Sequence, residues 1–83
     1  MKNKLFLIID VPASAQSYEM RVPRQIKIAK MLELIRDFLR RRNSEYIPDE
    51  NSVLCDESTG RVLDFNSFVE TAGLEPGGRI MIM

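Results

Sequence analysis

The chain contains no histidine, and this absence removes most of the familiar nucleophile triads of enzymes. Histidine is the usual general base at neutral pH and the commonest metal ligand, so triads and metal centres built on it are excluded. The single cysteine, Cys55, cannot form an internal disulfide and has no histidine to activate it, so we interpret it as a buried or half-buried strand residue. We assign no catalytic residue, no cofactor and no metal ligand, and predict that the protein is not an enzyme.

The chain also has a formal net charge of zero and no long apolar run. Twelve Lys and Arg residues balance twelve Asp and Glu residues over 83 positions, so no bulk field draws the molecule to nucleic acid or to an anionic membrane. The N-terminal apolar run from Leu5 to Ile9 is too short for a membrane span or a signal peptide. We predict a cytoplasmic protein of one domain, residues 1–83, with no nucleic-acid partner and no direct membrane insertion.

Two β-rich segments near the N-terminus predict a hairpin. The first runs from Leu5 to Val11 and stops at Pro12, and the second runs from Ser17 to Val22 and stops at Pro23. Polar and apolar residues alternate along the second segment, which is typical of a half-solvated edge strand. The expected inward side chains are Leu5, Leu7, Ile9 and Val11 on the first strand and Tyr18, Met20 and Val22 on the second, which leaves Phe6 and Ile8 on the outer face.

A long amphipathic helix is predicted from about Lys27 to Arg42. Apolar residues recur there at helical spacing, so they form one stripe that can cover a sheet. No Ser, Thr, Asp or Asn stands at the expected start to cap the helix. The stripe consists of Ile28, Met31, Leu32, Ile35, Phe38 and Leu39.

The segment after the helix predicts a loop and then a second hairpin. Asn43 to Asn51 is polar and contains Pro48, which favours a loop. Val53 to Cys55 and Arg61 to Leu63 then flank a turn at Glu57 to Gly60. These two short runs are the third and fourth predicted strands.

The last part of the chain predicts a short helical turn and a final strand. Asp64 or Asn66 is expected to cap the helical turn, which Gly73 ends. Glu75 to Gly78 is expected to form a tight turn before the strand at Arg79 to Met83. The adjacent glycines are interpreted as turn residues, and no Gly-Gly tail follows the strand, so we expect a protein that is not conjugated.

This order of elements, together with one C-terminal motif, resembles ubiquitin-like domains. The motif is Gly73-Leu74-x-x-Gly77-x-Arg79-Ile80-x-Ile82, and it is similar to the last quarter of those domains. The resemblance implies an α+β fold of the β-grasp (ubiquitin-like) type, in which a five-stranded mixed sheet packs on one long helix and a short helical turn precedes the last strand.

A second motif narrows the resemblance. Tyr18-x-Met20-x-Val22-Pro23 leading into Ile28-x-x-Met31-Leu32-x-Leu34-Ile35 is similar to the strand-to-helix passage of the YukD/EsaB-type proteins found with Gram-positive type VII secretion systems. That family often has a proline at the helix start and an acidic residue after the last-turn glycine, where this chain has Lys27 and Gly78. The resemblance implies an accessory or regulatory protein of the secretion machinery that acts by non-covalent contact and supplies no catalytic residue.

The first candidate binding site is the outer face of the predicted sheet. If Ile80 and Ile82 are core residues, strand alternation turns Met81 and Met83 outward. The first and last strands are neighbours in a β-grasp sheet, so Phe6, Ile8, Met81 and Met83 are expected to form one exposed apolar patch that binds a protein. The alternative is that the methionines point inward or that a loop covers the patch.

The second candidate site is a cluster of four arginines on the predicted helix, namely Arg36, Arg40, Arg41 and Arg42. It could make an electrostatic contact with phosphates or with an acidic protein, or it could be a solvated helix end. A third alternative is contact with the acidic segment Glu45 to Glu57 of a second copy, which would give a head-to-tail homodimer that weakens with salt.

The predicted function is that of a non-conjugated, cytoplasmic ubiquitin-like protein-interaction module, an accessory or regulatory component of type VII protein secretion. Its partner is expected to be a secretion ATPase or membrane component, and a homodimer stays open as an alternative. Three other functions also stay open: a sulfur-carrier or modifier-type protein that lacks its tail, the cytosolic domain of a larger membrane secretion component, and nucleic-acid binding through the arginine cluster.

Overall fold

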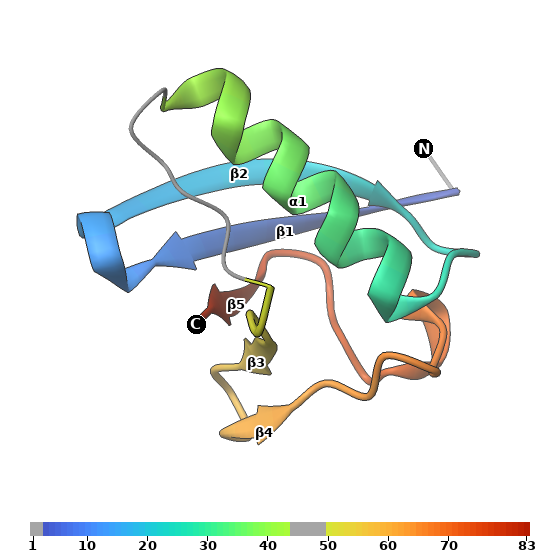
Figure 1. The fold of residues 1–83 in the computed structure, drawn as a ribbon. Helices are drawn as coiled ribbons and strands as arrows, with labels where there is room; N and C mark the ends of the chain where they lie inside the picture. The colour runs from blue at the N-terminus through green and yellow to red at the C-terminus, as the bar shows by residue number, and fades with distance from the viewer. Residues whose placement is uncertain (1–2, 44–49) are drawn as a thin grey trace.

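The computed structural model describes residues 3–43 and 50–83, which form one five-stranded sheet crossed by one α-helix (Figure 1). The sheet order is β2-β1-β5-β3-β4, with β1 and β5 parallel and the other neighbours antiparallel. The predicted fold class is therefore confirmed. The elements are β1 (Lys4–Val11), a 3-10 turn (Pro12–Ser14), β2 (Gln16–Pro23), α1 (Ile28–Arg42), β3 (Leu54–Asp56), β4 (Arg61–Val62), a second 3-10 turn (Val69–Thr71) and β5 (Gly78–Ile82).

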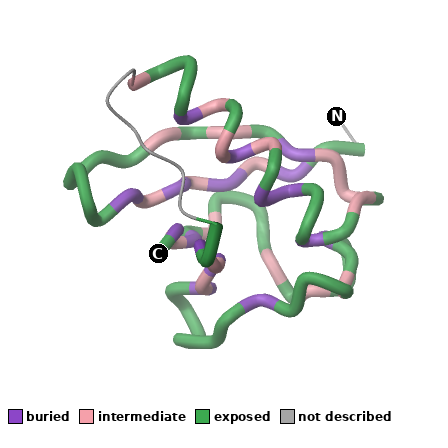
Figure 2. The backbone as a smooth tube through the Cα atoms, viewed as in Figure 1, coloured by how far each residue is buried: buried purple, intermediate pink, exposed green. Residues whose placement is uncertain are grey.

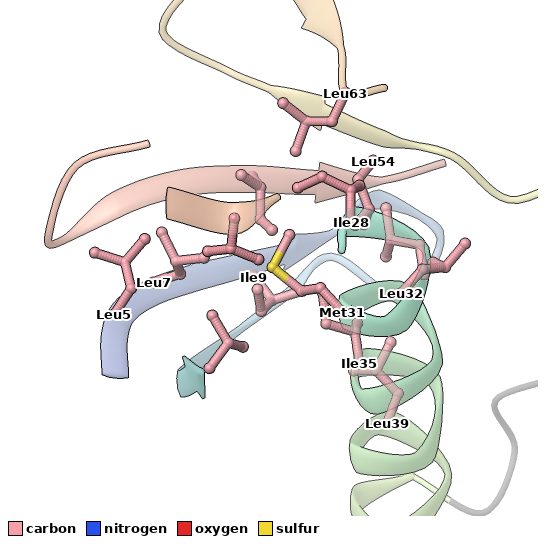
Figure 3. Close-up of a cluster of buried hydrophobic side chains, with 14 of the residues drawn as sticks. Leu5, Leu7, Ile9, Ile28, Met31, Leu32, Ile35, Leu39, Leu54 and Leu63 are labelled. Atoms are coloured by element: carbon pink, nitrogen blue, oxygen red, sulfur yellow. The ribbon is translucent and has the colours of Figure 1, made fainter. Parts of the chain in front are cut away.

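The core lies between α1 and one face of the sheet. Buried and half-buried residues alternate along β1, which confirms the predicted inward set (Figure 2). In Figure 3, Leu5, Leu7 and Ile9 of β1 and Met31 of α1 point into the same interior space. The predicted helical stripe is buried except for Phe38, which is half-buried at the side of the core.

The start of α1 is held by backbone groups because the sequence offers no capping side chain. The N–H of Ile28 donates to the carbonyl of Ser67 over 2.8 Å, and the N–H of Ala29 donates to the carbonyl of Phe65 over 3.2 Å. These bonds satisfy two of the donors that a helix start leaves without an intrahelical partner. The segment after β4 therefore fixes where the helix begins.

The short helical turn forms as predicted but is not capped as predicted. It spans Val69–Thr71 and has no side-chain hydrogen bond at its start. Asp64 instead accepts a hydrogen bond from the N–H of Asn66 over 2.9 Å, so it shapes the preceding turn. The expectation that Asp64 or Asn66 caps the helical turn is wrong, because the chain makes a separate turn before Phe68.

The adjacent glycines form the predicted turn into β5. Gly77 has a φ of 77°, a value that glycine adopts at little cost. The N–H of Gly78 donates to the carbonyl of Glu75 over 2.9 Å, and a Cβ atom at Gly78 would lie 2.9 Å from that same oxygen. The turn therefore leaves no room for a side chain at Gly78, where the resembling family often has an acidic residue.

Two further findings concern the described residues alone. Over 3–43 and 50–83, no helix has the length and apolar content needed to cross a membrane. Over the same residues, no group of three or more His, Cys, Asp or Glu side chains could hold a metal ion. Most of the loop predicted over 43–51 lies outside the described residues.

Candidate functional site

The predicted binding residues lie on the face of the sheet turned away from α1. Ile80 is fully buried and Ile82 is 5% exposed, so alternation along β5 turns Met81 and Met83 to the opposite face. Phe6, Ile8 and Met81 are half-buried there, and Met83 is 55% exposed. The outward orientation predicted for all four side chains is confirmed.

An ion pair divides this outer face into two apolar areas. The Nε atom of Arg79 donates to Asp10 Oδ2 over 3.0 Å, and its Nη2 atom donates to Asp10 Oδ1 over 2.9 Å. Ile8 lies beside Arg79, and Met81 lies beside Asp10, in the register of β1 and β5. The ion pair therefore runs diagonally between Ile8 and Met81, and the four residues do not form one continuous patch.

The ion pair belongs to a charged network that alters two pKa values. The hydrogen bonds from Arg79 lower the pKa of Asp10 from 3.8 to about 2, against the desolvation that would raise it. The hydroxyl of Ser17 on β2 also donates to Asp10 Oδ1. A hydrogen bond with Asp10 raises the pKa of Glu57, and desolvation adds to that rise. The centre of the outer face is thus polar and ordered.

A larger apolar area lies on the β5 side of the ion pair. Cys55 of β3 stands between Met81 on β5 and Val62 on β4, so these three side chains form one cross-strand row. Val53 and Met83 pair in the next row through two N–H···O=C bonds of 3.0 Å. We call this area the Met81 patch; its members are Val53, Cys55, Val62, Met81 and Met83.

Three members of the Met81 patch were missed by the sequence reasoning. Val62 is 57% exposed, and Val53 and Cys55 are half-buried. The sequence did contain the information needed to find them. Leu54 and Leu63 are both buried, and strand alternation then turns their neighbours in the chain outward. Assigning faces to the second hairpin as well as the first would have found them.

Phe6 belongs to a different neighbourhood, beside the edge strand β2. Its register partner there is Arg21, and that of Ile8 is Glu19. A shallow hollow of about 420 Å³ lies at this edge and is lined by Phe6, Glu19, Met20, Arg21 and Phe38. The Phe6 side of the outer face is therefore bordered by charges of both signs on β2.

The predicted arginine cluster is also divided, since its members line grooves on two sides of α1. Arg41 and Arg42 line a groove between α1 and β2. Arg36 and Arg40 line another groove with Lys30 and Glu33. The cluster is therefore divided between two grooves, and residues 45–49 of the acidic segment predicted to meet it in a second copy lie outside the described residues.

Comparison with known proteins yields similarity in structure alone. No protein-family model and no curated protein matches the sequence. Among solved structures, a chain of the toluene 4-monooxygenase HD complex with the inhibitor 4-bromobenzoate has a TM-score of 0.79 at 11% identity, with 95% of each chain covered. The UBL domain of Plasmodium falciparum Dsk2 has a TM-score of 0.74 at 11% identity, again with 95% of each chain covered.

A third match is the ubiquitin of Caldiarchaeum subterraneum, with a TM-score of 0.73 at 14% identity over 95% of this chain and 90% of that one. This chain has the ubiquitin-like fold. At such low identity the similarity concerns the backbone arrangement, so the functions of these proteins do not transfer to the ubiquitin-like chain described here. Its function has to be inferred from its own surface.

The ion pair of this ubiquitin-like sheet predicts a pH dependence of stability. Because the pKa of Asp10 is lower in the folded state, the pair stabilises the fold above pH 3.8, and this stabilisation is lost as the pH falls from 3.8 to about 2. We expect Asp10→Asn to lower the melting temperature at neutral pH and to flatten its decline over that acid range. The measurement is thermal unfolding of both proteins between pH 7 and pH 2.

Glu70→Gln is the matched control for this measurement, because Glu70 is an exposed carboxylate in the second 3-10 turn. Its acid profile is expected to follow that of the unaltered protein. The raised pKa of Glu57 acts in the opposite direction, since protonation of that group favours the folded state. Because Asp10 is the main cause of that rise, Glu70→Gln retains the effect of Glu57, whereas Asp10→Asn reduces it. Identical acid profiles for Asp10→Asn and the unaltered protein would contradict the stabilising role of the pair.

Proposed function

We propose that this chain is a ubiquitin-like protein-interaction module that binds its partner non-covalently through the outer face of the sheet. The observation that carries the proposal is the Met81 patch, in which Met83 is 55% and Val62 is 57% exposed around the half-buried Met81. Contiguous exposed apolar side chains usually mark an interaction site. Methionine side chains suit this role because they adapt their shape to a partner.

A non-covalent mode of binding agrees with the use of the adjacent glycines. Carriers and modifiers present a Gly-Gly pair on an extended segment, whereas Gly77 and Gly78 are held in the turn before β5. The N–H of Gly77 donates to the carbonyl of Phe6 over 2.8 Å, so the turn is also tied to β1. The intact mass of the protein from its native cells tests the competing carrier or modifier function, because a covalent adduct would add mass.

We further propose that the module works on the cytoplasmic side of a type VII secretion system, as an accessory or regulatory component. Support comes from the resemblance of the β2-to-α1 passage to YukD/EsaB-type proteins. The partner would then be a secretion ATPase or a membrane component of the apparatus. If the native gene product proves much longer than this chain, the alternative of a domain within a membrane component gains support.

The test combines affinity purification and crosslinking from native cells with a variant that alters both apolar areas of the outer face. We choose Phe6→Glu with Met81→Lys, because the register places Phe6 beside Arg21 and Met81 beside Asp10, and each new charge then has an opposite neighbour. The expected result is a fold intact by circular dichroism and partner binding weaker by about 30-fold or more, as for the loss of an interface hot spot.

The control is a second pair of exposed apolar residues away from this face, Phe65→Glu with Phe68→Lys. These side chains are 37% and 42% exposed in the segment that holds the start of α1. The control variant is expected to keep the partner. Retention of the partner by Phe6→Glu with Met81→Lys would refute the outer-face site, and a partner attached covalently would refute the non-covalent mode.

A further inference from the structure

Three sulfur-bearing side chains stand at adjoining positions in the Met81 patch. Cys55 of β3 is the register partner of Met81 on β5, and both are half-buried on the outer face. Met83 lies two residues beyond Met81 on the same face and is 55% exposed. The chain has six sulfur-bearing residues, five Met and one Cys, so half of its sulfur atoms gather on this one surface. Such a cluster of donor atoms of one kind points to a metal ion that prefers them.

The hydrogen-bond register brings the three side chains within reach of one ion. The N–H groups of Val53 and Met83 each donate to the carbonyl of the other residue over 3.0 Å. Bonded pairs recur at every second position of an antiparallel ladder, so Cys55 and Met81 are also a bonded pair, with Cα atoms about 5.5 Å apart. Cys55 and Met83 are diagonal neighbours, which lie about 7–8 Å apart and within reach of a long side chain. Methionine has three rotatable side-chain bonds, so both thioethers can turn toward the Cys55 thiol.

The donor atoms of this surface suit a soft metal ion. One carboxylate, that of Asp10, lies beside Met81 in the register, and both of its oxygens accept hydrogen bonds from Arg79. That carboxylate is therefore already engaged by a guanidinium. Over residues 3–43 and 50–83, no group of three or more His, Cys, Asp or Glu side chains could hold a metal ion. Thioethers are a different kind of donor, and soft thiolate and thioether ligands together favour Cu(I).

The charge of the cluster favours a monovalent ion. A Cys55 thiolate carries one negative charge and the two thioethers carry none, so Cu(I) would form a neutral complex with them. A divalent ion such as Zn²⁺ would leave one uncompensated positive charge beside the apolar side chains of Val53 and Val62, which is costly. Cu(I) therefore matches the cluster both in softness and in charge.

We propose that Cys55, Met81 and Met83 form a binding site for Cu(I) on the outer face of the sheet. When the ion binds, the S–H bond of Cys55 breaks, its proton goes to solvent and a sulfur–copper bond forms. The two thioethers donate lone pairs, and copper stays in the +1 state, so no group is oxidised or reduced. No metal ligand was assigned from the sequence, because the three residues come together only through the register of β3 and β5.

The first test is an anaerobic titration of the protein, without added thiol, with Cu(I) supplied as its acetonitrile complex. We expect one Cu(I) per chain, ultraviolet absorption from thiolate-to-copper charge transfer, and a protein that stays monomeric in sedimentation. X-ray absorption of the complex is expected to show three sulfur neighbours around copper. Zn²⁺ is expected not to bind. Equal affinity for Zn²⁺, no spectral change with Cu(I), or one ion shared by the cysteines of two chains would overturn the proposal.

Ag(I), a soft monovalent ion that is stable in air, locates the site by NMR of protein labelled with ¹³C in the methionine methyl groups. We expect Ag(I) to shift the methyl resonances of Met81 and Met83 and to leave those of Met20 and Met31 in place. Met31 is fully buried in the core, and Met20 is half-buried on β2. Shifts at Met20 as large as those at Met81 would indicate non-specific binding to thioethers and would overturn the proposal.

Replacing sulfur by carbon tests each ligand. Met81→Leu and Met83→Leu conserve side-chain volume and apolar character but remove the thioether, so the fold is expected to be retained. Each is expected to weaken Cu(I) binding about tenfold, whereas Cys55→Ser, which removes the thiolate, is expected to weaken it about 100-fold or more. Met20→Leu is the matched control and is expected to bind Cu(I) normally. Competition with bicinchoninate measures the affinities, and full affinity in the Met81→Leu, Met83→Leu double variant would overturn the proposal.

The double leucine variant also separates the copper site from the proposed protein interface, on which the copper site does not rest. An apolar interface tolerates leucine in place of methionine, so this variant is expected to keep the protein partner and to lose copper. The two functions can therefore fail independently. Unaltered copper binding in the double leucine variant would overturn the copper site alone, whereas retention of the partner by Phe6→Glu with Met81→Lys would overturn the interface alone.

Discussion

Ile80→Asp is expected to unfold the protein, whereas Met81→Asp, one residue later, is expected to leave it folded. Ile80 is fully buried on the α1 side of β5, and Met81 is half-buried on the outer face. A buried carboxylate without a partner costs several kcal/mol, which is comparable with the total stability of about 5–15 kcal/mol of a small domain. Circular dichroism and urea unfolding of the two variants measure the difference.

The two positions are adjacent on β5 and share one feature of their surroundings. Each faces an aspartate in the sheet register, Asp56 of β3 opposite Ile80 and Asp10 of β1 opposite Met81. Repulsion between neighbouring carboxylates is therefore present in both variants, and a difference between them reports the face of the sheet. Unfolding of Met81→Asp would mean that Met81 is a core residue, and the proposed binding face would then be wrong.

Ile35→Ala is expected to lower the free energy of unfolding by about 2–5 kcal/mol. The Ile35 side chain is fully buried in the middle of the α1 stripe. Its truncation removes apolar contacts and leaves a cavity that the sheet and helix can fill in part, which accounts for the width of the expected range. Urea denaturation, with the slope of the transition compared between proteins, gives the change in stability.

Glu33→Ala on the same helix is the control, because Glu33 is exposed and forms a single 3.6 Å ion pair with Lys30. Its effect is expected to stay within about 0.5 kcal/mol. A loss of stability at Ile35 no larger than that at Glu33 would be incompatible with α1 packing its apolar stripe on the sheet.

The hydrophobic pattern was sufficient to predict the helix and the strands, because periodicity is a local property of the chain, and the resemblance to ubiquitin-like domains supplied their arrangement. The 3.6-residue period predicted α1, and the two-residue period predicted the inward faces of β1 and β5. The turn at Gly77 and Gly78 was predictable because few residues accept its backbone conformation. The start of α1 was harder to predict, since carbonyl groups of Phe65 and Ser67, distant along the chain, take the place of a capping side chain.

The sites were predicted less completely than the fold. Alternation correctly turned Phe6, Ile8, Met81 and Met83 outward, and the ubiquitin-like order of strands was expected from the resemblance. What alternation could not predict was the position of each outward side chain relative to those on neighbouring strands. The register places Asp10 and Arg79 between the apolar residues of β1 and β5. It also places Val62 of β4 in the apolar area on the β5 side of that ion pair.

The sequence was therefore enough to predict the helix and the strands, the buried faces of β1, β2, α1 and β5, and the turn that begins the last strand, because each depends on residues close together in the chain. The division of the outer face, the split of the arginines between two sides of α1 and the charged groove beside β2 required the folded structure. Each of these features brings together residues from distant segments, and their distances are set by strand register and helix placement, which no local pattern specifies.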